Sequence, residues 1–339
     1  MAEAVLAFMW VGLTAYALFG GADFGAGFWD LLAGGTERGR PPRRLIEHSI
    51  GPVWEANHVW LIFVLVVLWT SFPAAFAAVA STLYIPLTLA ALGMIARGAA
   101  FAFRHSVDQL ALQRFFGASF AFSSVTTPFF LGTIAGAVGS GRVPPGIAAG
   151  HVLTSWLNPT SILGGVIAVG TCAYLAAVYL CADAQLHDDS ALLEYFRRRG
   201  IVTAALVGVV ALGGIAVLRA DAPHLFAGLS TRGLPLVLVS AAAGISSIVL
   251  LARRRLGLAR VAAALAVTAV LWGWAVAQYP YLLHPGLTVQ AAAAPEATLR
   301  AMLISLVVGA ALLVPSLVFL FTLFQREHDT ATHPAQEPF

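Results

Sequence analysis

The sequence carries nine apolar runs, each long enough to cross the hydrocarbon core of a membrane, roughly 30 Å thick, as an α-helix. Of all residues 59% are hydrophobic and only 10% are charged, with a mean hydropathy of +0.85. A water-exposed surface needs more charge than that. The sequence therefore predicts an all-α polytopic membrane protein with packed helix bundles and spans near 4–32, 54–71, 74–101, 115–138, 161–184, 201–218, 234–252, 259–279 and 300–324.

The segments between these runs are too short to fold as separate domains. We therefore expect one transmembrane domain over residues 1–325 and a polar, disordered cytoplasmic tail over residues 326–339. The first run lacks the basic flank of a cleavable signal peptide, so we expect it to remain as a membrane helix. The short connection Ser71-Phe72-Pro73 predicts a tight hairpin between the second and third spans.

The distribution of basic residues predicts how the chain is oriented. All nineteen basic residues are arginines. On the predicted spans, fifteen of them lie on the side of the C-terminal tail and four on the other side. Positive charge collects on the cytoplasmic side of membrane proteins. We therefore expect a periplasmic N-terminus and a cytoplasmic C-terminus.

Titratable and hydrogen-bonding residues gather where the second predicted span begins, in the run Gly51–Ile62. Glu55 and His58 are three residues apart, so they share one face of a helix. Ionisable residues inside a membrane usually pair with each other or carry protons within a bundle. Trp54 and Trp60 also suit anchors at the membrane interface, so a purely anchoring role for this run stays open.

The first predicted span combines acidic residues with closely spaced glycines. Tyr16, Asp23 and Asp30 recur every seven residues and form one polar stripe on a helix. On the expected orientation Asp30 lies near the cytoplasmic surface, and Asp23 lies about 10 Å deeper. Alternatively, Asp23 only pairs with an arginine, and the glycines only let neighbouring helices approach; these are Gly20, Gly21, Gly25 and Gly27.

Polar residues also interrupt the later spans. Arg97 lies in the third run, where we expect it to pair with Asp23 or Glu55 or to extend to the membrane surface. Thr126-Thr127-Pro128 predicts a kink in the fourth span. Asn158 lies directly before a proline, so we expect it to be the N-terminal cap of the fifth span.

The sequence offers no redox centre of its own. A haem within the bilayer needs an axial His, Met or Cys ligand, and of nine histidines only His58 lies in a predicted span. Cys172 and Cys181 fall on opposite faces of one helix, and no metal-binding motif surrounds them. We therefore expect this chain to bind no haem and no metal.

These motifs together resemble those of subunit II of the cytochrome bd-type quinol oxidases. The run Gly51–Ile62 resembles the P-x-W-[D/E]-x-N-x-V-W-L-I signature of that family, and Gly20–Gly27 resembles its glycine-rich G-x-D-x-G-x-G segment. Arg97 after the third apolar run and Asn158-Pro159 before a glycine-rich fifth run are similar too. The number of helices and the expected orientation extend the resemblance over the whole chain.

The resemblance implies a partner, subunit I, that holds two b-type haems, haem d and the quinol site. The complex would oxidise membrane quinol and reduce oxygen to water, electrogenically, with protons taken from the cytoplasm of a bacterium. Subunit II is expected to bind no haem, to stabilise subunit I and to line a proton path at their interface. A bound quinone and small accessory membrane subunits are further partners that the resemblance allows.

For this path we hypothesise a proton entry at the cytoplasmic surface and a relay through the first turn of the second span. The residues assigned to it are Glu55, Asp23, Asp30, His48 and His58, with Arg97 as charge partner and with Gly20, Gly21, Gly25, Gly27, Trp54, Asn57 and Trp60 as motif and packing residues.

Two other classes of function stay open. One is a proton-coupled secondary transporter, in which Asp23, Glu55 and Arg97 would be the coupling residues. Transporters often repeat broken helices in both halves of the chain, whereas these polar residues gather in the first three spans. The other is a purely structural assembly subunit whose carboxylates only pair across an interface.

Overall fold

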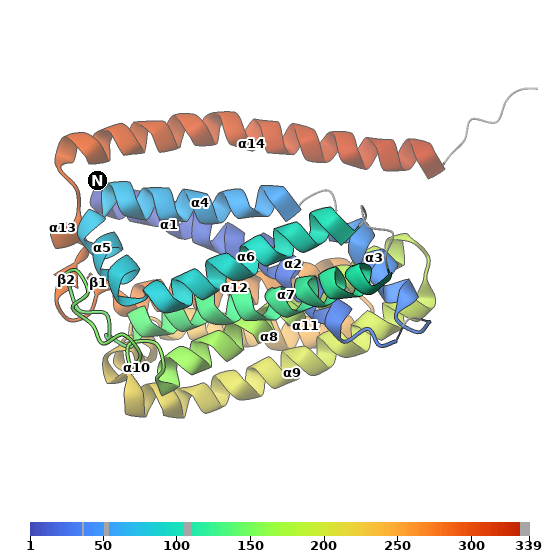
Figure 1. Ribbon diagram of the computed structural model, residues 1–339, viewed down its shortest axis with the longest axis horizontal. Helices are drawn as coiled ribbons and strands as arrows, with labels where there is room; N and C mark the ends of the chain where they lie inside the picture. Colours follow the sequence, from blue (N-terminus) through green and yellow to red (C-terminus); the bar gives the residue numbers. More distant parts are fainter. Residues whose placement is uncertain (36, 51–53, 105–109, 333–339) are drawn as a thin grey trace, which may run out of the picture.

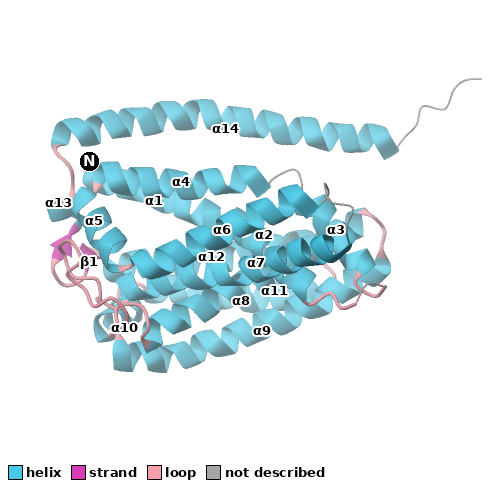
Figure 2. Cartoon of the chain, in the orientation of Figure 1, coloured by secondary structure: helices cyan, strands magenta, loops and turns pink. Residues whose placement is uncertain are grey.

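The long helices lie side by side in one elongated bundle, and the short elements gather at its two ends (Figure 1). The computed structural model describes residues 1–35, 37–50, 54–104 and 110–332. Within these ranges the only strands form a two-stranded hairpin at one end, and nearly all the remaining chain is helical (Figure 2). Helices suit a bilayer because they satisfy their backbone hydrogen bonds internally.

Eight helices among the described residues are long and apolar enough to cross a membrane, and a ninth crossing results if α4 and α5 count as one broken span. The first crossing runs through α1 (Ala2–Ala15), the π-helical segment η1 (Tyr16–Gly20) and α2 (Gly21–Leu31). The others lie in α6 (Tyr84–Arg104), α7 (Leu110–Gly139), α8 (Pro159–Leu186), α9 (Ser190–Asp221), α11 (Leu234–Ala252), α12 (Leu256–Gln278) and α14 (Glu296–Thr332). The all-α polytopic fold is confirmed, while the orientation of the chain stays a prediction.

The predicted third span, 74–101, is wrong at its start. After α4 (Trp54–Ser71) the chain bends by 118° into the short helix α5 (Pro73–Thr82). Proline is well tolerated in the first turn of a helix, where its missing N–H costs no hydrogen bond. A second break at Leu83 then separates α5 from α6. The hairpin therefore closes through a separate helix rather than through a three-residue turn.

Two helices extend beyond their predicted spans. α9 starts before the predicted 201–218, because Asp189 caps it by accepting a hydrogen bond from Leu192 N at 2.9 Å. Asn158 caps α8 as expected, with its Oδ1 accepting from Ser161 N at 2.9 Å. α14 continues to Thr332, so the tail expected from residue 326 begins as helix, and residues 333–339 lie outside the described ranges.

Short elements that the sequence analysis did not predict occupy both ends of the bundle. One lies at the end where α8 is joined to α9 (Figure 1), and we call this the arginine-rich end because its helix ends and connections include Arg38–Arg44, Arg197–Arg199 and Arg253–Arg255. The others lie at the opposite end. The element at the arginine-rich end is α3 (Arg40–Ile50). The elements at the opposite end are α10 (Pro223–Ser230), β1 (Tyr281–Leu283), β2 (Leu287–Thr288) and α13 (Val289–Ala292).

Polar contacts tie together the end that holds the hairpin. Arg142 Nη1 and Nη2 donate to Asp221 at 2.8 and 2.5 Å, and Asp221 also accepts from Thr160 Oγ1 at 2.6 Å. These hydrogen bonds raise the pKa of Arg142. Nearby the imidazoles of His224 and His284 stack with centroids 3.9 Å apart. Burial lowers the pKa of both, so the stack is uncharged at neutral pH.

The glycines of α2 let the backbones of α2 and α8 touch. A methyl group on Gly25 would overlap the backbone carbonyl of Cys172. One turn further along, Trp29 Nε1 donates to Ala173 O at 2.8 Å. In lipid, helix association depends on such close van der Waals packing, because apolar burial gives little advantage there. Gly25 therefore determines how closely α2 and α8 pack.

We expect Gly25→Ala to destabilise the protein by about 1–3 kcal/mol, because the added methyl group must displace the backbone of α8. Gly213→Ala on α9 is the matched control, since no atom lies within 4 Å of the added group. Alanine favours a helix over glycine by about 1 kcal/mol, so the control should unfold no earlier than the parent. Thermal unfolding of the purified protein in detergent measures both, and equal midpoints for the two variants would contradict this packing argument.

Candidate functional site

A carboxylate and a guanidinium are buried together inside the bundle. Asp23 comes from α2 and Arg97 from α6, and Arg97 Nη2 donates to Asp23 Oδ1 at 2.7 Å. The same nitrogen donates to the backbone carbonyl of Asp23 at 3.0 Å. The two side chains are only 3% and 1% exposed. Of the expected partners of Arg97, the structure places Asp23 beside it.

The third wall around this pair comes from α7. Arg97 Nη1 donates to Ser124 Oγ, and Ser124 Oγ donates to Phe120 O at 2.6 Å. The guanidinium carbon lies 4.4 Å from the ring centroid of Phe120 and 5.0 Å from that of Phe24. A desolvated cation gains about 2 kcal/mol from an aromatic face. A methyl group on Gly27 would overlap Ser124 Oγ, so this glycine leaves room for the contact.

The pair keeps unused hydrogen-bonding capacity. Within the described residues, Asp23 Oδ2 accepts no hydrogen bond and Arg97 Nε donates none. Buried polar atoms are normally satisfied, and unsatisfied ones are often found where a site has a chemical role. The second carboxylate oxygen of Asp23 is therefore an acceptor that Arg97 does not occupy. Chemically, it can take a hydrogen bond or a proton.

A π-helical turn positions the neighbouring aromatic groups. η1 directs the ring of Tyr16 across Gly20, where a methyl group would lie 2.9 Å from that ring. The imidazole of His58, on α4, has its centroid 6.4 Å from that of Tyr16. Next to His58, Asn57 Nδ2 donates to Phe19 O at 3.4 Å. Single π turns in α-helices are common at functional sites. Here the turn connects the start of α4 to the first crossing.

Asp30 and His48 lie at the arginine-rich end, away from the buried pair. Asp30 is in the last turn of α2, about 10 Å along the helix from Asp23, and its Oδ1 accepts from Arg43 Nε of α3 at 2.8 Å. The ring of His48, also on α3, meets that of His187 with centroids 5.3 Å apart. α3 therefore brings charged and titratable side chains to the end of α2.

The remaining motif residues are Glu55, Trp54, Trp60 and Gly21. Glu55 and Trp54 belong to the first turn of α4, but their side chains lie outside the described part of the chain. Trp60 packs beside the cluster that contains Tyr16. A methyl group on Gly21 would lie 3.6 Å from the nearest atom, an ordinary contact, so space alone does not require this glycine.

Sequence reasoning missed Ser124 and Phe120, which complete the surroundings of Arg97. The available signal was the pair Ser123-Ser124 inside an otherwise apolar run, where a hydroxyl that faces the bundle needs a partner. Phe120 is four residues before Ser124, so it lies on the same helix face. Its type alone gave no hint, because aromatic residues are common in every span.

Fold and site define a multi-pass, all-helical membrane protein whose bundle encloses a carboxylate–guanidinium pair. Residues 1–324 match the family described as cytochrome bd terminal oxidase subunit II. The chain belongs to this family.

Individual relatives agree with this assignment. The chain is similar to cytochrome bd ubiquinol oxidase subunit 2 of Bacillus subtilis (strain 168), with 32% identity over 48% of this chain and 49% of that one. A putative cytochrome bd menaquinol oxidase subunit II of the same organism is 21% identical over 95% of each chain. Cytochrome bd-I ubiquinol oxidase subunit 2 of Escherichia coli (strain K12) is 28% identical over 52% of this chain and 48% of its own length. The first and third alignments thus span about half of those relatives.

A solved structure shows the same fold over nearly the whole chain. This is the structure of bd oxidase from Geobacillus thermodenitrificans, to which the chain is similar with a TM-score of 0.75 and 25% identity. The alignment covers 95% of this chain and 98% of that one.

We expect Asp23→Asn and Arg97→Gln each to destabilise the protein by about 3–5 kcal/mol, because each leaves the other charge buried without a partner. The double variant should lose less than the sum of the two single losses, since it removes both charges. Thermal unfolding and the yield of monodisperse protein measure the effect.

Arg300→Gln is the matched control for these variants. Arg300 pairs with Glu296 at 2.9 Å, but the two side chains are 67% and 68% exposed. An exposed pair contributes at most about 1 kcal/mol. If the single variants at Asp23 and Arg97 unfolded no earlier than Arg300→Gln, the buried pair would not be the stabilising contact described above.

Proposed function

We propose that this chain is the haem-free subunit II of a quinol oxidase that reduces oxygen in a bacterial cytoplasmic membrane. Membership in the subunit II family supports this, as do the relatives, which are described as subunits of ubiquinol and menaquinol oxidases. In this proposal subunit I holds two b-type haems, haem d and the quinol site. This chain stabilises subunit I and provides a route for protons from the cytoplasm.

The exposed apolar surface supports a partner in the membrane. Among the described helices, α14 packs against α1 and α4 and lies along one edge of the bundle (Figure 1). Ile304 and Leu312 of α14 are exposed, as are Val59 and Ile62 of α4. A second helix bundle along this edge would cover these side chains. Van der Waals packing against it would then stabilise both subunits.

The observation that carries the proton role is the enclosed Asp23–Arg97 pair. An ionised carboxylate deep in a membrane protein is costly, and such residues commonly mark the routes of protons or substrates. The oxygen of Asp23 that Arg97 leaves unoccupied can accept a proton without breaking the 2.7 Å contact of the other oxygen.

The position of the other acids supports a route from the arginine-rich end. Asp30 and His48 lie at that end, and Glu55 belongs to the first turn of α4, where the helix dipole favours a carboxylate. We propose that protons enter near Asp30 and His48, pass Glu55 and Asp23, and continue towards the haems of the partner. His58 lies beside this route, and the positive charge of Arg97 tunes the carboxylates.

The subunit assignment predicts which spectral signals accompany the chain. We expect this chain to copurify with a second membrane subunit whose reduced-minus-oxidised spectrum shows haem b and haem d bands. Expressed alone, a folded chain should show no stoichiometric Soret band, because His58 is its only histidine within a predicted span. A secondary transporter would purify without haem in both experiments, so a pure, active complex lacking these bands would refute the assignment.

The proton route predicts a specific kinetic defect. We expect Glu55→Gln to lower quinol-driven oxygen consumption by about tenfold or more, because a relay acid contributes about 10²–10⁴-fold to a proton-transfer step, while haem content and assembly stay normal. Glu55→Asp should keep much of the rate, because the acid survives.

Glu37→Gln is the matched control, since Glu37 is an exposed acid in the connection to α3. It should leave the rate unchanged. A Glu55→Gln complex that assembles normally and turns over at the parent rate from pH 6 to 8 would favour the structural assembly role for this motif. The subunit assignment would survive that result.

A further inference from the structure

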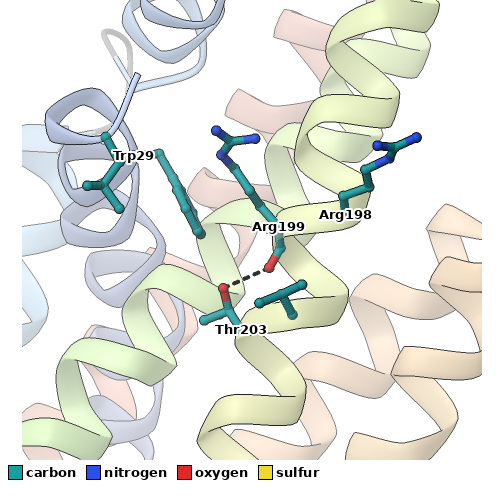
Figure 3. A pocket seen from close by; sticks show the side chains of 6 residues that line it. Trp29, Arg198, Arg199 and Thr203 are labelled. Atoms are coloured by element: carbon teal, nitrogen blue, oxygen red, sulfur yellow. Dashed lines mark hydrogen bonds between the residues drawn. The ribbon is translucent and has the colours of Figure 1, made fainter. Parts of the chain in front are cut away.

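A shallow pocket of about 350 Å³ opens between α2 and α9 at the arginine-rich end. Trp29 and Leu32 line it from the side of α2, and α9 contributes Arg198, Arg199, Val202 and Thr203. Figure 3 shows the guanidinium of Arg199 above the indole of Trp29, with Arg198 pointing away from it on the outer side of α9. One wall of the pocket is therefore aromatic and apolar, and the other carries two cations.

The cations around this pocket outnumber the carboxylates. Glu194 accepts hydrogen bonds from both Arg197 and Arg198 at 2.8 Å, and Arg254 Nη2 lies 3.6 Å from it. Arg199 forms no ion pair with a carboxylate among the described residues. Three guanidinium groups thus share one carboxylate, and Arg199 adds a fourth positive charge, so the pocket keeps an excess of positive charge.

Arg199 is held in place by aromatic rings instead. Its guanidinium carbon lies 3.3 Å from the centroid of Tyr195 and 5.7 Å from that of Trp29. Its Nη1 donates to Tyr195 O at 3.3 Å. Thr203 Oγ1 donates to Arg199 O at 2.7 Å and remains buried (Figure 3). Stacking on a ring leaves the remaining N–H groups of a guanidinium free to bind an anion.

An apolar surface continues from the pocket along α9. Val202 lines the pocket and is itself exposed, and Leu206, Val209 and Leu212 are exposed further along the helix. Their spacing of three and four residues places them on one face of α9. The cationic pocket therefore adjoins one end of the row of exposed apolar residues on α9, a helix long enough to cross a membrane.

We propose that this pocket binds the phosphate headgroup of an anionic glycerophospholipid whose acyl chain lies along the exposed face of α9. Guanidinium groups bind phosphate oxygens through paired, charge-assisted hydrogen bonds. Basic pockets between membrane helices hold anionic headgroups in the same way. None of the residues that line the pocket is assigned to the proton route.

Native mass spectrometry of the delipidated complex in detergent, titrated with phosphatidylglycerol, tests the proposal. Phosphatidylglycerol should bind at least about tenfold more tightly than phosphatidylcholine with the same acyl chains, because the choline group cancels the phosphate charge. The double variant Arg198→Gln/Arg199→Gln should lose this preference. The control Arg253→Gln/Arg255→Gln changes the charge at the same end by the same amount outside the pocket, and should keep it.

A second variant and a competitor separate the acyl chain from the headgroup. Val202→Ala/Leu206→Ala should weaken phosphatidylglycerol binding while the cations remain. Inorganic phosphate at millimolar concentration should displace little of the lipid, because it lacks the apolar contact. The proposal is overturned if both lipids bind equally, if the control loses as much binding as the pocket variant, or if phosphate alone displaces the lipid completely. Unchanged haem spectra in every variant would show that the subunits are still assembled.

Discussion

The buried contact between Asp23 and Arg97 is the interaction on which the interior of this protein depends. A bare carboxylate or guanidinium within a bilayer is costly, and together at 2.7 Å they cancel each other's charge. The ion pair links α6 to α2, and the hydroxyl of Ser124 adds α7, which packs against both helices, to the same site. An apolar core would tolerate small shifts of these helices. A hydrogen-bonded ion pair allows very few.

Small residues make this arrangement possible. Gly27 leaves room for Ser124 beside Arg97, and Gly25 lets α2 lie directly on the backbone of α8. A side chain at Gly25 would push α8 away, and one at Gly27 would displace Ser124 from Arg97. The glycine-rich motif and the charged residues therefore depend on each other. Gly27 leaves space for a polar contact, and Gly25 leaves space for a second backbone.

The two ends of the bundle are built differently. At one end Arg142, Asp221 and Thr160 join separate helices, and a short hairpin and α10 complete the surface. The arginine-rich end is joined by α3 and carries acids, imidazoles and an excess of guanidinium groups. The arginine-rich end therefore differs from the other end in how many charged and titratable side chains it brings together.

The sequence predicted the features of this protein that depend on residues close together in the chain, and it missed most of those that depend on contacts between distant residues. Spans near 115–138, 161–184, 234–252 and 259–279 coincide with α7, α8, α11 and α12, because length and hydropathy are local properties that the bilayer itself imposes. The glycine-rich motif and the motif around Glu55 are also local, so they could be recognised in the sequence, and they gave the family resemblance that the comparisons confirmed.

The breaks within helices and the residues at which helices begin and end were harder to predict from the sequence. The 118° bend between α4 and α5 was not predicted, nor was the cap at Asp189 that starts α9 early. The contact of Arg97 with Asp23 was only one of the possibilities that the sequence left open, and Ser124, Phe120 and the pocket beneath Arg199 lay beyond it. Those contacts join residues that are distant in the chain, so only the packing of whole helices decides them.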